Sequence, residues 1–177
     1  MKAVLMSMHP NWCELIASGE KTIEIRKNKP KLEPPFKVYI YCTIGDGASG
    51  DRLVPSGITC GKVIGEFACD KVEQGHILWV KEQPEYYDRV EEKTQLTYRQ
   101  MFDYLGESGI GCFWHISNLV IYDDPKGLSD FRKHCNHKND CFTDACFNCE
   151  RYDYIGHRCY DDVVRPPQSW CYVEVQE

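Results

Sequence analysis

The first 26 residues constrain the fold most, because they encode a strand, a helix and a second strand with only short connections. Residues 3–8 form an apolar run. Pro10 then suits the first turn of a helix and Gly19 suits its end. Residues 22–26 alternate, with Ile23 and Ile25 on one face and polar side chains on the other. We therefore expect the chain to enter a sheet at once and to gather charged residues where the helix meets the second strand.

The rest of the chain continues with strands and short helices. Apolar runs predict four more strands, at residues 36–43, 62–72, 112–122 and 169–175. Residues 84–92 and 97–105 have the spacing of two short helices, the second beginning at a threonine cap. Prolines make residues 29–35 a loop, and glycines make residues 45–57 another. Six strands and three helices, with strands at both ends, predict one α+β domain over residues 1–177, built as a small closed β-barrel.

The composition narrows the class of protein. A hydrophobic content of 42% in 177 residues suits one globular domain that needs no disulfides. No apolar run reaches the roughly 18 to 20 residues of a membrane helix, and the N-terminal run is too short for a secretory signal. We therefore expect a cytoplasmic protein with no membrane partner. The sequence contains no phosphate-binding loop and no dinucleotide-binding fingerprint.

Charge is distributed unevenly along the chain. The net charge of −6 argues against non-specific binding of nucleic acid over the whole surface. Residues 26–37 nevertheless contain five basic residues and one acidic residue. Such a strip can bind a phosphate backbone, because affinity follows the local field. It is equally consistent with a solvated lysine-rich loop.

Three short motifs near the N-terminus resemble the opening of ASCH-domain proteins, which share the PUA-like β-barrel fold. They read Ser-Met-His-Pro at positions 7–10, Glu-Leu-Ile-Ala-Ser-Gly at 14–19 and Lys-Thr-Ile-Glu-Ile-Arg at 21–26. Residues 166–174, Pro-Pro-Gln-Ser-Trp-Cys-Tyr-Val-Glu, resemble the last strand of one bacterial and phage branch of that family. The resemblance does not cover residues 133–165. It implies a module that binds RNA or a nucleotide.

The candidate ligand-binding residues surround the junction between the first helix and the second strand. Arginine offers a planar fork for phosphate or a base edge, and lysine supplies a mobile point charge. Tyrosines at alternate positions of the next strand could stack on bases. Alternatively, Glu24 and Arg26 form a structural ion pair and the tyrosines belong to the core. We expect Lys21→Ala to weaken binding without lowering thermal stability. The predicted ligand-binding residues are Ser7, His9, Trp12, Lys21, Glu24, Arg26 and Tyr41.

A second hypothesis is a hydrolase that acts on a modified nucleoside. The resemblance includes a branch that cleaves the acetyl amide of N4-acetylcytidine and reads Lys-Thr-Ile-Thr-Ile-Arg. Here Glu24 stands in place of the second threonine, so a hydroxyl nucleophile is lost. In an enzyme, Lys21 and Glu24 would form the acid–base pair, but Arg26 would stabilise the carboxylate and weaken it as a base. The nearest candidates for a third catalytic group are Glu91 and Glu92, and neither can be assigned, so binding is favoured over catalysis.

The eleven cysteines fall into two groups. Six are scattered, most of them in or beside apolar runs, where a free cysteine acts as a small buried hydrophobe. Five lie between positions 135 and 159, in a polar segment that contains one Cys-x2-Cys knuckle. An odd total without an export signal favours a metal site over disulfides. The predicted ligands of a structural Zn²⁺ are Cys135, Cys146, Cys149 and Cys159.

Alternatives remain for this Cys-rich insertion, defined as residues 133–165 within the single domain. Cys141 or a histidine (His134, His137 or His157) could replace one thiolate ligand. The segment could also hold no metal, or carry an iron–sulfur cluster. Metal binding would supply the folding energy that such a polar segment lacks. A third hypothesis is therefore a protein-interaction or regulatory module that uses the zinc insertion as its contact surface.

Overall fold

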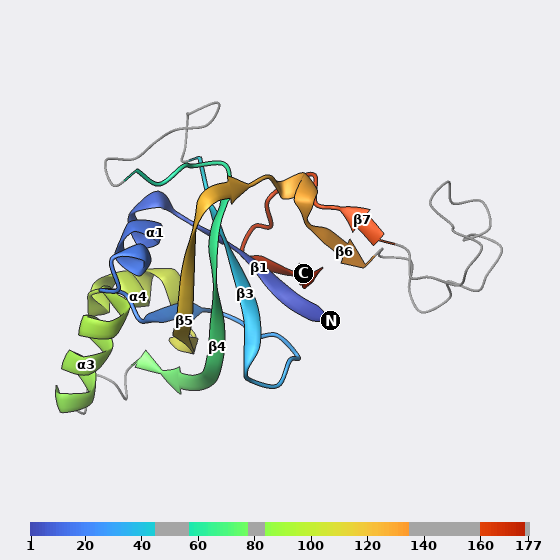
Figure 1. The fold of residues 1–177 in the computed structure, drawn as a ribbon. Helices are drawn as coiled ribbons and strands as arrows, with labels where there is room; N and C mark the ends of the chain where they lie inside the picture. The colour runs from blue at the N-terminus through green and yellow to red at the C-terminus, as the bar shows by residue number, and fades with distance from the viewer. Residues whose placement is uncertain (45–56, 78–83, 135–159, 176–177) are drawn as a thin grey trace, which may run out of the picture.

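The computed structural model describes residues 1–44, 57–77, 84–134 and 160–175. Within these residues, six strands form one mixed sheet, and three helices lie together on one side of the molecule (Figure 1). The predicted α+β class, with six main strands and three helices, is confirmed. The sheet strands are β1 (Lys2–Met8), β2 (Ile23–Arg26), β3 (Phe36–Cys42), β4 (Val63–His76), β5 (Ile110–Lys126) and β8 (Trp170–Glu174), and the helices are α1 (Pro10–Ala17), α3 (Pro84–Thr94) and α4 (Tyr98–Leu105).

The sequence does not predict a small ribbon on the side of the molecule opposite the helices (Figure 1). A 3-10 turn, η1 (Leu128–Asp130), leads into β6 (Arg132–His134), which pairs antiparallel with β7 (Tyr160–Asp162). Three-residue strands are too short to show a period of two. Val163, next to this ribbon, is 2% exposed and donates its backbone N–H to the carbonyl of Phe131. The C-terminal part of the predicted insertion therefore belongs to the folded body.

The strand order is β2-β5-β4-β3-β1-β8. β1 runs parallel to β3 because α1 and β2 form a crossover between them, and the other neighbours are antiparallel. β1 also pairs with β8, with Lys2 opposite Glu174. The edge strands are β2 and β8, and in the described residues the side chain of Arg26, rather than a backbone ladder, connects these two ends. The arrangement is consistent with a PUA-like barrel closed by side chains.

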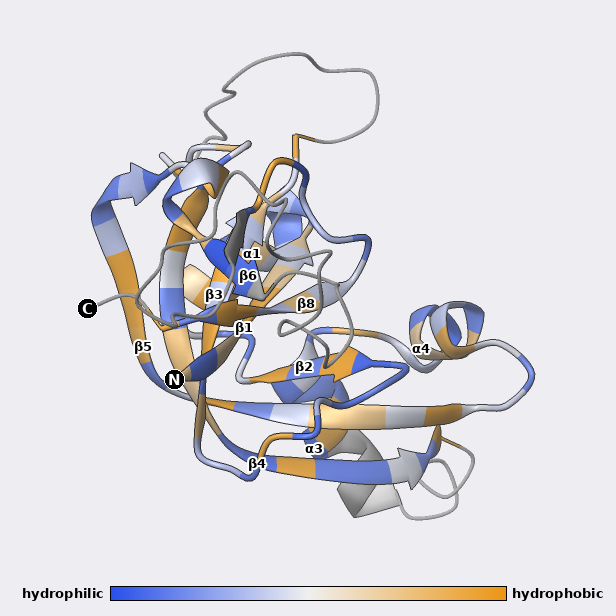
Figure 2. Cartoon of the chain, turned by 90° about the vertical axis from the view of Figure 1, so that its right-hand side faces the viewer, coloured by the Kyte–Doolittle hydropathy of each residue, from blue (hydrophilic) through white to orange (hydrophobic). Residues whose placement is uncertain are grey.

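Three buried clusters hold the domain together. β1 is buried on both faces, with Val4 in a core that contains Trp114, and Leu5 in a second core that contains Phe131. A third core joins Ile25 of β2 to α3 and α4. Hydrophobic and hydrophilic stretches alternate along β4 and β5 (Figure 2). Because the isoleucines of β2 face the third core, the polar side chains of this strand face the opposite way, toward α1 and β1.

The helices are short, and their ends match signals in the sequence. α1 begins at Pro10, and Gly19, with a φ of 80°, follows its end. α4 begins after Thr97, whose hydroxyl accepts from the backbone of Gln100 while the Gln100 side chain accepts from the backbone of Thr97. In the part of the chain that the structure describes, no helix is long and apolar enough to cross a bilayer.

Candidate ligand-binding site

A cavity of about 640 Å³ opens where α1, β2 and α4 meet the segment that leads into β8. Its volume lies in the range of small-molecule sites. Six of the seven predicted ligand-binding residues line it, namely Ser7, His9, Trp12, Lys21, Glu24 and Arg26. The structure therefore brings together residues that the sequence places on three different elements. Further lining side chains include Lys27, Asn28, Thr43, Gln100, Tyr104 and Gln168.

Three charged side chains alternate in sign in the wall of this pocket. Lys21 Nζ lies 3.2 Å from one carboxylate oxygen of Glu24, and Arg26 Nε lies 3.0 Å from the other. All three residues are buried. Because two cations share one carboxylate, the cluster keeps an excess of positive charge, which favours an anionic or electron-rich ligand group. The ion pair that the sequence left as an alternative to a ligand site is thus present, and it forms part of the pocket.

Lys21 is held rigidly, in contrast to the mobile charge expected from the sequence. Its ammonium group donates to the carbonyl of Ile23 at 3.0 Å and to that of Thr94 at 2.6 Å, in addition to Glu24. All three N–H groups therefore have acceptors, and the nitrogen lies 5.4 Å from the centre of the Trp12 ring. Burial lowers the pKa of Lys21, and the nearby carboxylate opposes this effect. From this geometry we expect Lys21→Ala to lower thermal stability, against the expectation from the sequence.

Arg26 connects the two halves of the pocket. Its Nη2 donates to the carbonyl of Ser7 at 2.7 Å, and its Nη1 donates to the hydroxyl of Ser169 at 3.3 Å. The Ser7 hydroxyl donates in turn to the carbonyl of Pro167 at 2.6 Å. These bonds fix the segment before β8 as one wall of the pocket.

Two polar atoms of the pocket lack hydrogen-bond partners in the residues that the structure describes. They are Nε of Arg26 and Oγ1 of Thr43. The contact of Arg26 Nε with Glu24 is close enough for electrostatic attraction, but its geometry is not that of a hydrogen bond. Buried polar atoms in folded proteins nearly always have a partner, in the protein or in bound water. Both atoms are covered by neighbouring atoms, so they belong to the interior of the pocket wall and do not themselves face a ligand.

Two aromatic side chains, Trp12 of α1 and Tyr104 of α4, also line the pocket. Tyr104 is 40% exposed, and Trp12 is half-buried. Burial raises the pKa of Tyr104, against the opposing effect of Arg26, so the hydroxyl stays protonated at neutral pH and can donate a hydrogen bond. The pocket thus combines charge, hydrogen-bonding groups and aromatic surface.

The position of Tyr41 does not support its predicted role. Tyr39 and Tyr41 share a face of β3, as the alternation predicts, but both lie in the core that contains Leu5 and Phe131. Tyr41 is 4% exposed and is not among the residues that line the pocket. Central strands of this sheet are buried on both faces, and the tyrosines lie on the face away from α1. We therefore exclude Tyr41 from the candidate site.

Sequence reasoning also missed part of the pocket. Gln100, Asp103 and Tyr104 come from α4, for which the sequence predicted a helix but no part in the site. Gln168 and Ser169 come from the Pro-Pro-Gln-Ser-Trp motif that carries part of the family resemblance. That motif was a usable signal for the last two residues, whereas nothing in the sequence of α4 distinguishes a pocket-lining tyrosine from a surface one.

The cysteines in the described residues behave as the sequence predicts. Cys13, Cys42, Cys60, Cys69 and Cys112 are buried free thiols, and Cys171 is partly buried. The same residues contain no group of histidine, cysteine or acidic side chains that could hold a metal. The proposed zinc ligands Cys135, Cys146, Cys149 and Cys159, with the alternatives Cys141, His137 and His157, lie outside the described residues, and the side chain of His134 does so as well.

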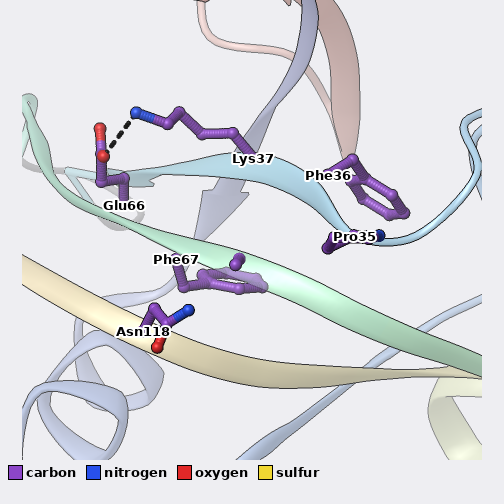
Figure 3. A pocket seen from close by; sticks show the side chains of 7 residues that line it. Pro35, Phe36, Lys37, Glu66, Phe67 and Asn118 are labelled. Atoms are coloured by element: carbon purple, nitrogen blue, oxygen red, sulfur yellow. Dashed lines mark hydrogen bonds and ion pairs between the residues drawn. The ribbon is translucent and has the colours of Figure 1, made fainter.

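A second, smaller hollow of about 230 Å³ lies on the outer surface of β3, β4 and β5. Lys37 and Glu66 form an ion pair of 2.6 Å at its edge, and Phe67 and Asn118 lie below them (Figure 3). Glu66 also accepts a hydrogen bond from Tyr122. The cation and the carboxylate of this hollow satisfy each other, so it has no excess charge to attract a ligand.

The fold and the site define a small α+β domain with a charged pocket beside its first helix. The model of the ASCH domain family matches residues 6–103, more than half of the chain, and the chain belongs to this family. The matched range contains the end of β1, all of α1 and β2 and most of α4, and with them most of the pocket. Among curated proteins, no match is found.

Solved structures of the ASCH protein of Zymomonas mobilis have a similar fold. In one crystal structure, the Zymomonas protein is 18% identical to this chain, and the alignment covers 97% of this chain and 87% of the Zymomonas chain, with a TM-score of 0.59. A tyrosine-to-phenylalanine mutant is 18% identical over 98% of this chain and 91% of its own, with the same TM-score. A serine-to-alanine mutant is 17% identical over 97% and 88%, again with a TM-score of 0.59. At this level of identity the likeness is one of fold.

Proposed function

We propose that this protein binds RNA or a nucleotide in the pocket around Lys21, Glu24 and Arg26. ASCH domains are generally proposed to be RNA-binding modules, and this chain is a member of the family. The observation that carries the proposal is a pocket in which an excess of buried positive charge meets aromatic side chains. Positive charge attracts a phosphate or a base carbonyl, and aromatic rings stack on bases.

The geometry favours binding over proton transfer. Each carboxylate oxygen of Glu24 is already in contact with a cation, and every N–H group of Lys21 has an acceptor. A general base or acid must exchange protons with the substrate, and these groups would first have to break buried bonds. The pair therefore acts best as a fixed electrostatic surface.

Two aromatic residues of α4 offer a matched test of the pocket. Tyr104 lines it, whereas Phe102, equally exposed at 41% against 40%, does not. Stacking of one base is worth about 1–3 kcal/mol, so Tyr104→Ala should weaken binding of a short single-stranded RNA roughly 5- to 150-fold. Phe102→Ala should leave binding within about twofold. Equal affinities of the two variants, measured by fluorescence anisotropy, would remove the pocket from the proposal.

The alternative of a modified-nucleoside hydrolase is supported by one observation. Burial lowers the pKa of Lys21, and perturbed lysines beside carboxylates occur at catalytic sites. If the protein is such an enzyme, incubation with N4-acetylcytidine releases cytidine, and Glu24→Gln abolishes the release. Absence of turnover at enzyme concentrations comparable to the substrate would eliminate this alternative.

The zinc insertion is a separate part of the proposal. Residues His134 and Tyr160, which are covalently bonded to Cys135 and Cys159, are cross-strand partners in the β6–β7 ribbon. The two residues next to the proposed first and last ligands are therefore neighbours in space, which supports the proposal that both ligands bind one metal ion. We expect about one Zn²⁺ per chain by elemental analysis of the purified protein. A chelator should destabilise the insertion without emptying the pocket, whereas a metal content near zero would contradict the four-thiolate site.

A further inference from the structure

Four exposed lysines lie on the loop after β2 and at the start of β1. Lys27 lines the pocket, and its ammonium nitrogen lies 5.5 Å from the centre of the Tyr104 ring. Lys29 and Lys31 follow at alternate positions of the loop after β2, and Lys2 lies at the start of β1. We refer to Lys2, Lys27, Lys29 and Lys31 as the lysine track.

The loop that carries the track is attached to β8. The backbone N–H of Lys31 donates to the hydroxyl of Tyr172 at 2.6 Å, and the ammonium nitrogen of Lys2 lies 5.7 Å from the centre of the same ring. Pro30 of this loop is buried, and Trp170 packs against Tyr172 with 5.4 Å between the ring centres. Tyr172 therefore links the end of the loop to Lys2, so that the track runs from the pocket to the edge strand.

The lysines of the track have no carboxylate partner, unlike some other lysines of the surface. None of its four ammonium groups forms an ion pair with a carboxylate in the described part of the chain. By contrast, Lys37 pairs with Glu66 at 2.6 Å and Lys71 pairs with Glu73 at 2.8 Å. On a protein with a net charge of −6, four cations without ion-pair partners on one loop and the strand next to its end produce a local positive field.

We propose that the lysine track binds the phosphate backbone of a single-stranded nucleic acid, one nucleotide of which occupies the pocket. This inference rests on the proposed function and extends it from a nucleotide to a polymer. Lysines that follow a backbone, with aromatic rings beside them, are the combination that holds single strands. Tyr104 at the pocket and Tyr172 at the far end supply these rings. A strand can place a base in the pocket only where that base is unpaired.

The experiment compares the salt dependence of binding in two charge-matched triple variants of the full chain. The track variant carries Lys2→Gln, Lys29→Gln and Lys31→Gln, none of which lines the pocket. The control variant carries Lys71→Gln, Lys93→Gln and Lys126→Gln, which lie on other elements and outside the pocket. The probes are a fluorescein-labelled single-stranded RNA of about 12 nucleotides, the DNA of the same sequence, the duplex RNA and a mononucleotide. Thermal melting confirms that both variants are folded.

Each phosphate contact with a single strand contributes about 0.7 to the slope of log affinity against log salt. We expect the slope of the track variant to be smaller by about 2, so that a fourfold rise in salt should weaken binding by the control roughly 15- to 20-fold more than binding by the track variant. Mononucleotide binding, which depends on the pocket, should be equal in both variants. Similar results with the DNA strand would show that the track contacts phosphate rather than the ribose hydroxyl.

Three outcomes would overturn the inference in different ways. Equal salt slopes in the two triple variants, with intact binding of RNA and mononucleotide, would refute the track and leave the pocket in place. Equal or tighter binding of the duplex would refute the assignment to a single strand. If the wild-type protein binds neither the mononucleotide nor the RNA, the proposed function itself fails, and the track fails with it.

Discussion

Replacing Lys21 with methionine tests whether this residue supports the fold as well as the pocket. Methionine keeps the length and apolar volume of the side chain but removes its charge and three N–H donors. Lys21 is 1% exposed and holds the carbonyls of Ile23 and Thr94 together with the carboxylate of Glu24. The variant therefore leaves two buried carbonyls and part of a buried carboxylate without a donor.

A buried acceptor left without a donor costs about 1–3 kcal/mol; with two carbonyls affected and Glu24 still paired with Arg26, the expected total is about 3–5 kcal/mol. Solvent screens the charge of so buried a group very little. For a domain of this size, each kcal/mol lowers the melting temperature by about 2–4 °C, so Lys21→Met should melt roughly 6–20 °C below the wild type. The matched control is Lys27→Met, since Lys27 lies at the same pocket but is exposed. Its effect should stay within about 0.5 kcal/mol.

The assay is urea denaturation followed by circular dichroism, with thermal melting as a second measurement. A double variant, Lys21→Met with Glu24→Gln, should not recover the loss, because Glu24 is still paired with Arg26 in the single variant and its removal would leave the buried guanidinium without a carboxylate. A Lys21→Met protein that melts within about 2 °C of the wild type would show that Lys21 does not stabilise the fold. It would restore the expectation from the sequence that this lysine serves ligand binding alone.

Two further predictions concern the sheet. Partial burial tends to raise the pKa of Glu66, but hydrogen bonds, led by that from Lys37, outweigh this effect and leave the pKa below its ordinary value of 4.5. The unfolded chain therefore binds more protons than the folded protein, so stability should fall as the pH drops below about 4.5 toward the folded pKa. Glu66→Gln should flatten this part of the profile of melting temperature against pH. Gly65→Ala places a methyl group against the carbonyl oxygen of Val120 and should cost about 1–3 kcal/mol, whereas a methyl group at Gly75 of the same strand meets its nearest atom at 3.6 Å and should cost less. Equal unfolding free energies of the two alanine variants would contradict the close approach of the strands at Gly65.

The location of the pocket could be predicted from the sequence because its central residues are local. Ile23 and Ile25 fix which face of β2 is apolar, and Glu24 and Arg26 must then share the other. The helix ending near Gly19 brings Lys21 to the same junction. A period of two and a helix stop signal were sufficient for this part.

The partners of these residues could not be predicted, since they are distant in the sequence. Lys21 bonds to Thr94, 73 residues away, and Arg26 bonds to Ser169, 143 residues away. No local pattern encodes such contacts. The error over Tyr41 has a related cause, because alternation shows that Tyr39 and Tyr41 share a face but not which face of a doubly buried strand they occupy.

The bonds of Arg26 to both β1 and the segment before β8 have a consequence for synthesis on the ribosome. Residues 7–28, with most of the charged groups, emerge early, but Pro167 and Ser169 emerge more than a hundred residues later. Until then β1 has an open edge toward β8, and the guanidinium of Arg26 lacks one of its acceptors. Contacts at such long range form slowly. A nascent chain should therefore acquire its ligand-binding capacity in a single late step, when the last strand joins the first.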